Sequence, residues 1–343
     1  MQFGLYTPAA VATIGSPEIA QSIAEAKLPL ADGKRDLQLD IDLDVLLAAD
    51  ASGFDLALFA ERHLGTDLSA WVVAGAVASR FERMRALVAA HPGLFDPVMV
   101  AKLAASVDRI CKGRMAINIV NGWYEQEFQM FGGEILQGEE RYNRSKEFIE
   151  ILRGLWREDI YSFKGRHYTI DKAELMLKPA SRTPPEIYSV SNTDTGRDFI
   201  AESCDWWFAG MPKDADATHD DVMRALDAAI ADMRKRAATH GRTVHIALNP
   251  FLAIGTSTEE ALSDAVQKIF AYDPDPANRS PDRTRQIERR MLPATKAGLI
   301  GRPQDVRRQV RRFEDMGIEL LLLKVIPNAD NIRRIGGEVI LAA

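Results

Sequence analysis

Polar side chains that could do chemistry follow a series of short apolar runs in this chain, each at the point where a run ends. The clearest cases are Glu61, Arg62 and His63 after DLALFA, His91 after RALVAA, and Asn118 near the end of MAINIV. Imidazole can relay a proton near neutral pH, whereas carboxylate and amide groups accept or donate fixed hydrogen bonds. Further side chains at the ends of apolar runs are Tyr6, Thr7, Ser191, Asn192, Thr193, Trp207, Phe208, Asn249, Phe251 and Lys324.

This set of residue types argues against several familiar chemistries. A catalytic zinc needs three protein ligands, and His63 and His91 have no evident third ligand in the sequence, so we expect no metal. Neither a GxSxG elbow nor a phosphate-binding P-loop occurs. Aromatic, amide and hydroxyl groups together suit a flat ring with polar edges, although composition alone does not name that ligand.

The apolar runs alternate with longer amphipathic stretches, which must position these side chains. Eight such alternations favour an α/β fold, a (β/α)8 TIM barrel with insertion loops, in which the carboxyl ends of the strands carry the active site. The alternative is an open doubly wound sheet, which is disfavoured because TPAA rather than GxGxxG follows the first run. The predicted strands span 1–7, 55–60, 85–90, 115–120, 186–190, 205–210, 244–255 and 319–326. The predicted helices span 44–51, 71–77, 97–110, 139–156, 193–202, 214–239, 258–271 and 304–316, with a hairpin at 161–170 and a short terminal helix.

Two stretches interrupt the alternation in what we expect to be one domain over residues 1–343. Residues 9–43 separate the first strand from its helix, and residues 272–298 are polar and rich in proline and charge. Long connections of this kind are usually functional or disordered, so both are candidate lids.

Bulk composition excludes several partners. The 343 residues are 46% hydrophobic and carry a net charge of −6, with scattered Lys and Arg, so a large core is expected and nucleic acid is not. No apolar stretch reaches the ~18 residues that a membrane span needs, and no secretory leader is evident. Cys111 and Cys204 are far apart and are expected to be inert buried thiols in a reducing compartment, so we expect a cytoplasmic protein without membrane contact.

Two adjacent segments carry a family resemblance. NIVNGWYEQEFQMFG (residues 118–132) and GEERYNRSKEFIEILRGLW (138–156) resemble the bacterial-luciferase-like FMNH2-dependent monooxygenases, within the alkanesulfonate, dimethyl sulfone and pyrimidine monooxygenase branch. The resemblance extends to MVAKLAASVDRICKGRMAINIV (99–120) and GLIGRPQDVRRQVRRFEDMGIELLLL (298–323), and so covers most of the chain.

The resemblance implies a luciferase-like barrel that binds reduced FMN and uses molecular oxygen. It places Asn118 and Glu127 against the flavin, Arg141 and Tyr142 on the FMN phosphate, and Thr193 at a helix N-terminus that also faces the phosphate.

It also implies flavin contacts for Glu61 and Arg62 after the second strand. The catalytic candidates are His91 after the third strand, whose imidazole could donate or relay a proton, and His63 after the second.

The expected activity is that of a two-component monooxygenase supplied with FMNH2 by a separate NAD(P)H:FMN reductase. The sulfonate enzymes carry an Arg–His pair on the seventh strand, whereas this chain reads HIALNPFLA, closer to the dimethyl sulfone enzymes, and His245 begins the strand. The substrate is therefore expected to be a small organosulfur compound, a sulfone or an alkanesulfonate, that undergoes C–S cleavage. Relatives suggest a homodimer or homotetramer. Two alternatives stay open: a deazaflavin (F420)-dependent oxidoreductase, and a non-catalytic flavin-binding barrel.

Overall fold

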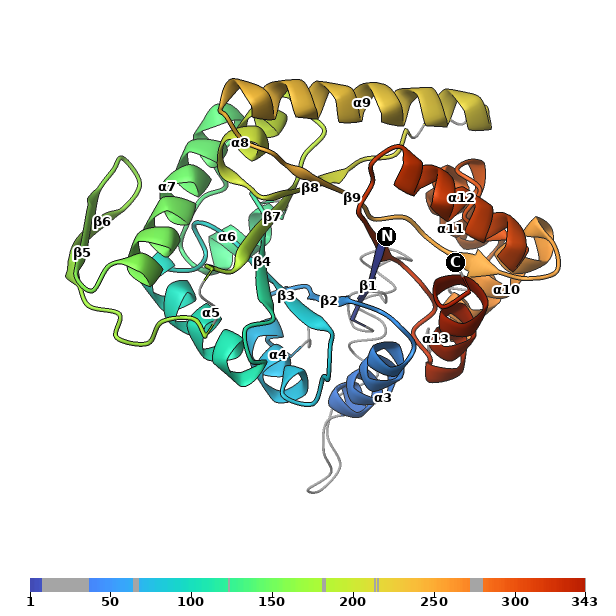
Figure 1. Cartoon of the computed structure of the whole chain (residues 1–343), viewed down its shortest axis with the longest axis horizontal. Coiled ribbons are helices and arrows are strands. Elements are labelled where there is room, and N and C mark those ends of the chain that lie inside the picture. The colour runs from blue at the N-terminus through green and yellow to red at the C-terminus, as the bar shows by residue number, and fades with distance from the viewer. Residues whose placement is uncertain are drawn as a thin grey trace.

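Eight parallel strands close into a barrel in the computed structural model, which describes residues 1–7, 37–63, 68–122, 124–180, 183–212, 214, 216–271 and 280–342 (Figure 1). Their order around the barrel is β1-β12-β9-β8-β7-β4-β3-β2, and β1 pairs with both β12 and β2. The predicted α/β barrel is confirmed. The barrel strands are β1 (Gln2–Tyr6), β2 (Leu56–Phe59), β3 (Arg85–Ala90), β4 (Met115–Ile119), β7 (Glu186–Val190), β8 (Trp206–Ala209), β9 (His245–Leu248) and β12 (Leu320–Leu323).

Helices surround the strands, and the hairpin of β5 (Tyr161–Lys164) and β6 (Thr169–Ala173) projects beside α7 (Figure 1). Local capping explains several helix starts. Asp96 accepts hydrogen bonds from the backbone N–H groups of Val98 and Met99, and Pro97 occupies the first turn, where its missing N–H is not needed. The helices are α3 (Leu37–Ala51), α4 (Ala70–Ala78), α5 (Pro97–Ile110), α6 (Glu125–Met130), α7 (Gly138–Arg157), α8 (Asp194–Ser203), α9 (His219–Thr239), α10 (Thr258–Ala271), α11 (Pro281–Lys296), α12 (Pro303–Asp315), α13 (Ala329–Ile335) and a π-helix, Gly336–Ile340.

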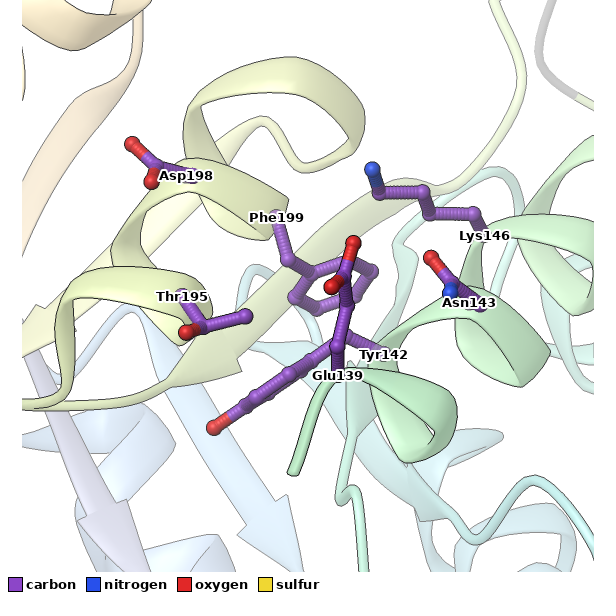
Figure 2. Close-up of a pocket in the computed structure, with 7 residues that line it drawn as sticks. All are labelled: Glu139, Tyr142, Asn143, Lys146, Thr195, Asp198 and Phe199. Atoms are coloured by element: carbon purple, nitrogen blue, oxygen red, sulfur yellow. The ribbon is translucent and has the colours of Figure 1, made fainter. Parts of the chain in front are cut away.

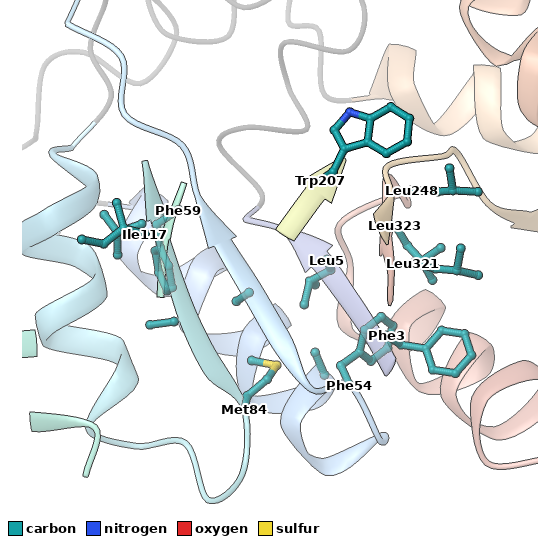
Figure 3. Close-up of a cluster of buried hydrophobic side chains, with 14 of the residues drawn as sticks. Phe3, Leu5, Phe54, Phe59, Met84, Ile117, Trp207, Leu248, Leu321 and Leu323 are labelled. Carbon is teal, nitrogen blue, oxygen red and sulfur yellow. The ribbon is translucent and has the colours of Figure 1, made fainter. Parts of the chain in front are cut away.

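The core has two layers because side chains alternate along each strand. Outward-facing residues pack under the helices, as Figure 3 shows for Phe3, Leu5, Ile117 and Leu321. Trp207 belongs to this outer layer and Trp206 to the inner one, as the alternation of neighbouring side chains along a strand requires. The inner layer consists of Leu56, Leu58, Leu87, Ala116, Tyr188, Trp206, Phe208, Ala247, Leu320 and Leu322.

The two ends of the barrel differ in chemistry. At the amino ends of the strands, Arg85 contacts the carboxylate of Glu186 at 2.5 Å, the side-chain oxygen of Gln2 at 2.8 Å and the hydroxyl of Tyr188 at 3.0 Å. At the carboxyl ends, polar side chains face inward beyond the inner layer on several strands. We call the mouth the six inward-facing residues Tyr6, His91, Asn118, Val190, Asn249 and Lys324, among which Val190 alone is apolar.

Several boundaries differ from the sequence prediction. Helix α3 begins at Leu37, so the candidate lid 9–43 is partly helical, and its residues 9–36 lie outside the described part of the chain. The predicted strand 244–255 breaks into β9 and β10 (Ala253–Ile254), which pairs instead with β11 (Ile300–Gly301).

The candidate lid 272–298 contains helix α11, although its Pro and charged residues were interpreted as a loop. Ser280 caps this helix by accepting from the backbone N–H of Arg283, and Pro281 occupies its first turn. Residues 272–279 lie outside the described part.

The two cysteines and the apolar character of the helices were both subjects of expectations from composition. Cys111 and Cys204 are free and buried, as expected, and burial raises the pKa of both thiols. Among the helices that the structure describes, none combines the length and apolar character needed to cross a bilayer.

Candidate active site

Hydroxyl groups from two neighbouring elements converge on Tyr142, near the start of α7. Its hydroxyl lies 3.2 Å from Ser191 Oγ and 3.3 Å from Thr193 Oγ1, and it accepts a hydrogen bond from Arg141 Nη2 at 2.9 Å. Thr193 also caps α8, because its Oγ1 accepts from the backbone N–H of Gly196 at 3.2 Å. The structure therefore brings together Arg141, Tyr142 and Thr193, the three residues that the resemblance assigns to a phosphate.

The environment of this hydroxyl cluster fits an anion. The N-terminus of α8 supplies partial positive charge and Arg141 supplies a full charge. Burial opposes ionisation of Tyr142, but its hydrogen bonds to Ser191 and Thr193 and the nearby Arg141 lower its pKa overall. Arg141 Nε is buried and makes no hydrogen bond within the described structure. The sequence places Ser191 at the end of a strand but does not indicate a role for it, because only the fold shows that it meets Tyr142.

A second feature of the same region is a pocket of about 250 Å³, lined by residues of α7 and α8 (Figure 2). The rings of Tyr142 and Phe199 stack there with centroids 5.4 Å apart. The Tyr142 ring thus lines this pocket while its hydroxyl belongs to the hydroxyl cluster. The lining residues are Glu139, Tyr142, Asn143, Lys146, Thr195, Asp198 and Phe199.

Two buried carboxylates lie beside the ends of β2 and β3. Glu61 Oε2 accepts from the backbone N–H of Ala70 at 2.8 Å and from Ser69 Oγ at 3.2 Å, so it caps the start of α4. Burial raises the pKa of Glu61 to about 7 despite these hydrogen bonds. Glu127 is 2% exposed and accepts from the backbone N–H of His63 at 2.8 Å.

Two histidine rings complete this acid–base cluster. The rings of His63 and His91 have centroids 5.9 Å apart, and His63 Nδ1 lies 4.0 Å from Glu61 Oε1. Burial and the neighbouring His63 lower the pKa of His91 to about 4, and burial also lowers the pKa of His63. Both imidazoles are neutral at pH 7, so Glu61 rather than His91 is the group that titrates near neutrality. The sequence does not indicate this, because burial rather than residue type decides which of the pKa values of Glu61 and His91 is the higher.

Asn118 faces into the mouth from β4 with an unsatisfied amide. It is 7% exposed, and its Oδ1 makes no hydrogen bond in the described structure. Leaving a buried acceptor unpaired costs about 1–3 kcal/mol, which indicates a position built for a ligand donor. Arg62 is half-buried after β2. Trp123, in the motif that follows Asn118, lies outside the described residues.

The opposite half of the mouth is polar as well. Asn249 Nδ2 donates to the Tyr6 hydroxyl at 3.3 Å, and Lys324 Nζ lies 5.5 Å from the centroids of both the Tyr6 and the Phe251 rings. Burial raises the pKa of Tyr6 to about 12. The sequence placed these residues at strand ends without assigning them a role.

In the described ranges, no three His, Cys, Asp or Glu side chains gather as a metal site would require. The fold and the polar mouth together define a (β/α)8-barrel enzyme with its site at the carboxyl ends of the strands. The model of the luciferase-like monooxygenase family matches residues 1–320, and the chain belongs to this family, as its motifs predicted.

Known proteins similar to this chain include the FMNH2-dependent dimethylsulfone monooxygenase of Pseudomonas fluorescens (strain Pf0-1). It is 29% identical over 330 residues, which cover 90% of this chain and 88% of that protein. Among solved structures, a long-chain alkane monooxygenase matches with a TM-score of 0.75 at 17% identity, covering 100% of this chain and 90% of that one. An F420-dependent secondary alcohol dehydrogenase matches with a TM-score of 0.71 at 16% identity, covering 100% and 99%. At these identities the two structures show the shared fold alone.

Proposed function

We propose that this protein is a two-component monooxygenase that binds reduced FMN and oxygenates a small organosulfur compound. The observation that carries the proposal is the hydroxyl cluster of Tyr142, Ser191 and Thr193 with Arg141 at the N-terminus of α8. The family match and the FMNH2-dependent relative add support.

The residues present fit FMN. Arg141 and the hydroxyl cluster would hold its phosphate, since guanidinium and hydroxyl donors with a helix N-terminus suit a dianion. The orphaned Asn118 amide would meet a polar edge of the ring. When bound, reduced FMN supplies the two electrons for oxygen activation, so that one oxygen atom enters the substrate and the other leaves as water.

The acid–base cluster on the same half of the mouth provides for proton handling. Neutral His91, 2% exposed, can form a hydrogen bond without introducing charge beside the ring. Glu61, with a pKa of about 7, can hold or release a proton at working pH, and His63 lies near both Glu61 and His91. Burial of these groups keeps water from the reacting centre.

The electrons for this reaction are proposed to come from a separate NAD(P)H:FMN reductase. The relative's dependence on FMNH2 supports this division, as does the lack of a GxGxxG motif after the first strand. C–S cleavage of a sulfone or an alkanesulfonate is the leading reaction, because the sequence around β9 resembles the dimethyl sulfone enzymes.

Anaerobic titration tests the flavin assignment directly. Binding of FMNH2 and of oxidised FMN would be followed by fluorescence for the wild type, Arg141→Ala and Asn118→Ala, with the exposed Arg308→Ala as a matched control. We expect the wild type to bind FMNH2 more tightly than oxidised FMN. Both site variants should bind FMNH2 more weakly than the wild type, whereas the control variant should bind it equally well. Absence of binding to either flavin would refute the assignment and favour the deazaflavin alternative. Oxygen consumption during turnover would also distinguish the two, because only the monooxygenase needs oxygen.

A further inference from the structure

One half of the mouth is not used by the flavin residues described above. Around the barrel, the strand order places β12 opposite β4, β9 opposite β3 and β1 opposite β7. Lys324, which follows β12, therefore faces Asn118 across the mouth, and Asn249 faces His91. A ring held on the Asn118 side exposes its other edge or face to Tyr6, Asn249 and Lys324.

Tyr6 presents a hydrogen-bond donor to this space. Its hydroxyl oxygen accepts from Asn249 Nδ2 at 3.3 Å, which leaves the hydroxyl hydrogen to point at another acceptor. Because burial raises the pKa of Tyr6 to about 12, the hydroxyl stays protonated over the working pH range.

Lys324 brings positive charge to the same place. Leu320 and Leu322 belong to the inner layer, so alternation directs Lys324 inward as well. Its ammonium lies 5.5 Å from the centroids of the Tyr6 and Phe251 rings, within the range in which ring faces attract a cation. The side chain is half-buried, and lower solvent content strengthens its interaction with an oxygen acceptor.

Apolar surfaces border the space that these donors face. Phe251 places a ring face beside Lys324. Val190 faces inward from β7, across the mouth from Tyr6, and is 42% exposed, so it borders the same open space from the far side. Three hydrogen-bond donors with one apolar surface beside them and another across the mouth match a small molecule with several oxygen atoms at one end and alkyl groups at the other.

We propose that Lys324, Tyr6 and Asn249 form the substrate subsite, which binds the sulfur-bound oxygen atoms of a small sulfone or alkanesulfonate. This inference rests on the proposed function for its substrate class. Among these three residues, Lys324 alone supplies a positive charge, from the end of β12. Lys324 is thus the residue that sets the preference between an anionic sulfonate and a neutral sulfone.

Calorimetric binding of methanesulfonate and of dimethyl sulfone to the anaerobic protein with FMNH2 tests the subsite without requiring turnover. Lys324→Met should weaken methanesulfonate binding by roughly 10–100-fold, the effect of losing a hydrogen bond to a charged group, and weaken dimethyl sulfone binding less. Lys324→Arg should retain most of the sulfonate affinity. Tyr6→Phe should weaken both ligands, and the exposed Lys235→Met should weaken neither.

The outcomes separate the subsite from the flavin assignment. Unchanged binding of both ligands in Lys324→Met, with an unchanged melting temperature, would overturn the subsite, as would an equal loss of FMNH2 affinity. If the wild type binds FMNH2 but neither sulfur compound, the substrate class and the subsite fail while the flavin assignment stands. If it does not bind FMNH2, the flavin assignment fails, and the same titrations on the flavin-free protein still decide the subsite.

Discussion

Gly196, in the first turn of α8, is the position where one added methyl group should damage the hydroxyl cluster most. A Cβ atom built there would lie 2.0 Å from Ser191 Oγ and 2.6 Å from the Tyr142 hydroxyl. Contacts below 3.0 Å are not tolerated, so Ser191 must move by about 1 Å or more. That shift would break the contacts of Ser191 Oγ with Tyr142 and Thr193, both 3.2 Å, and disturb the Ser191 carbonyl that accepts from Trp207 Nε1 at 2.9 Å.

The size of the effect follows from these contacts. Overpacking costs about 1–3 kcal/mol, and two weakened hydrogen bonds cost about 0.5–1.5 kcal/mol each. Replacing glycine within a helix returns only about 0.5–1 kcal/mol. Gly196→Ala should therefore lower the free energy of unfolding by roughly 2–4 kcal/mol and also weaken FMNH2 binding.

Gly75→Ala is the matched control, because Gly75 lies in α4 and a Cβ there meets its nearest atom only at 4.0 Å. This variant should be stabilised by about 0.5–1 kcal/mol with unchanged FMNH2 affinity. Urea unfolding and the anaerobic FMNH2 titration measure both quantities. If Gly196→Ala were as stable as Gly75→Ala and bound FMNH2 normally, the close packing of Gly196 against Ser191 would be refuted.

Three further predictions concern buried groups. The pKa of Glu61 is raised from 4.5 to about 7, so the folded state binds more protons than the unfolded state in that window, and stability falls as pH rises through it. Urea unfolding from pH 5 to pH 8 should show Glu61→Gln gaining stability relative to the wild type, and a constant difference would contradict the assignment. The pKa of His91 is lowered from 6.5 to about 4, so the wild type loses stability as pH falls from 6.5 towards 4. His91→Gln should lose less stability over that range. If the melting temperatures of the two proteins fell in parallel, a buried neutral imidazole would be contradicted. Gly93 has φ +94°, and a Cβ atom added there would lie 2.4 Å from the Arg144 guanidinium carbon. Gly93→Ala should therefore lower the melting temperature by about several degrees. An unchanged melting temperature would show that this loop accommodates the methyl group without loss of stability.

The sequence predicted the barrel because eight apolar runs alternate with amphipathic stretches, and each run is long enough to form a strand. The strands 85–90 and 186–190 agree with β3 and β7 residue for residue. The prediction failed where local composition and tertiary context disagree. Pro and charged residues around Ser280 suggested a loop, yet a proline in the first turn is compatible with the helix α11.

The residues of the candidate site also differ in whether a local sequence motif or only the fold identifies them. Arg141, Tyr142 and Thr193 could be proposed from motifs, and the structure places them together. The participation of Ser191 depends on the packing of β7 against α7, which spans 49 residues of sequence between Tyr142 and Ser191. The raised pKa of Glu61 depends on burial, and the position of Lys324 between two rings depends on barrel closure; neither is contained in a local pattern.

The central claim is that this barrel uses reduced flavin to place one atom of molecular oxygen in a sulfur compound. The most direct test supplies FMNH2 and isotopically labelled oxygen with dimethyl sulfone or methanesulfonate, and follows the label by mass spectrometry. We predict one labelled oxygen atom in the two C–S cleavage fragments taken together for each productive turnover, and loss of these products in Arg141→Ala. Product formation without label, or oxidation of the substrate without oxygen uptake, would contradict the claim and indicate hydride transfer.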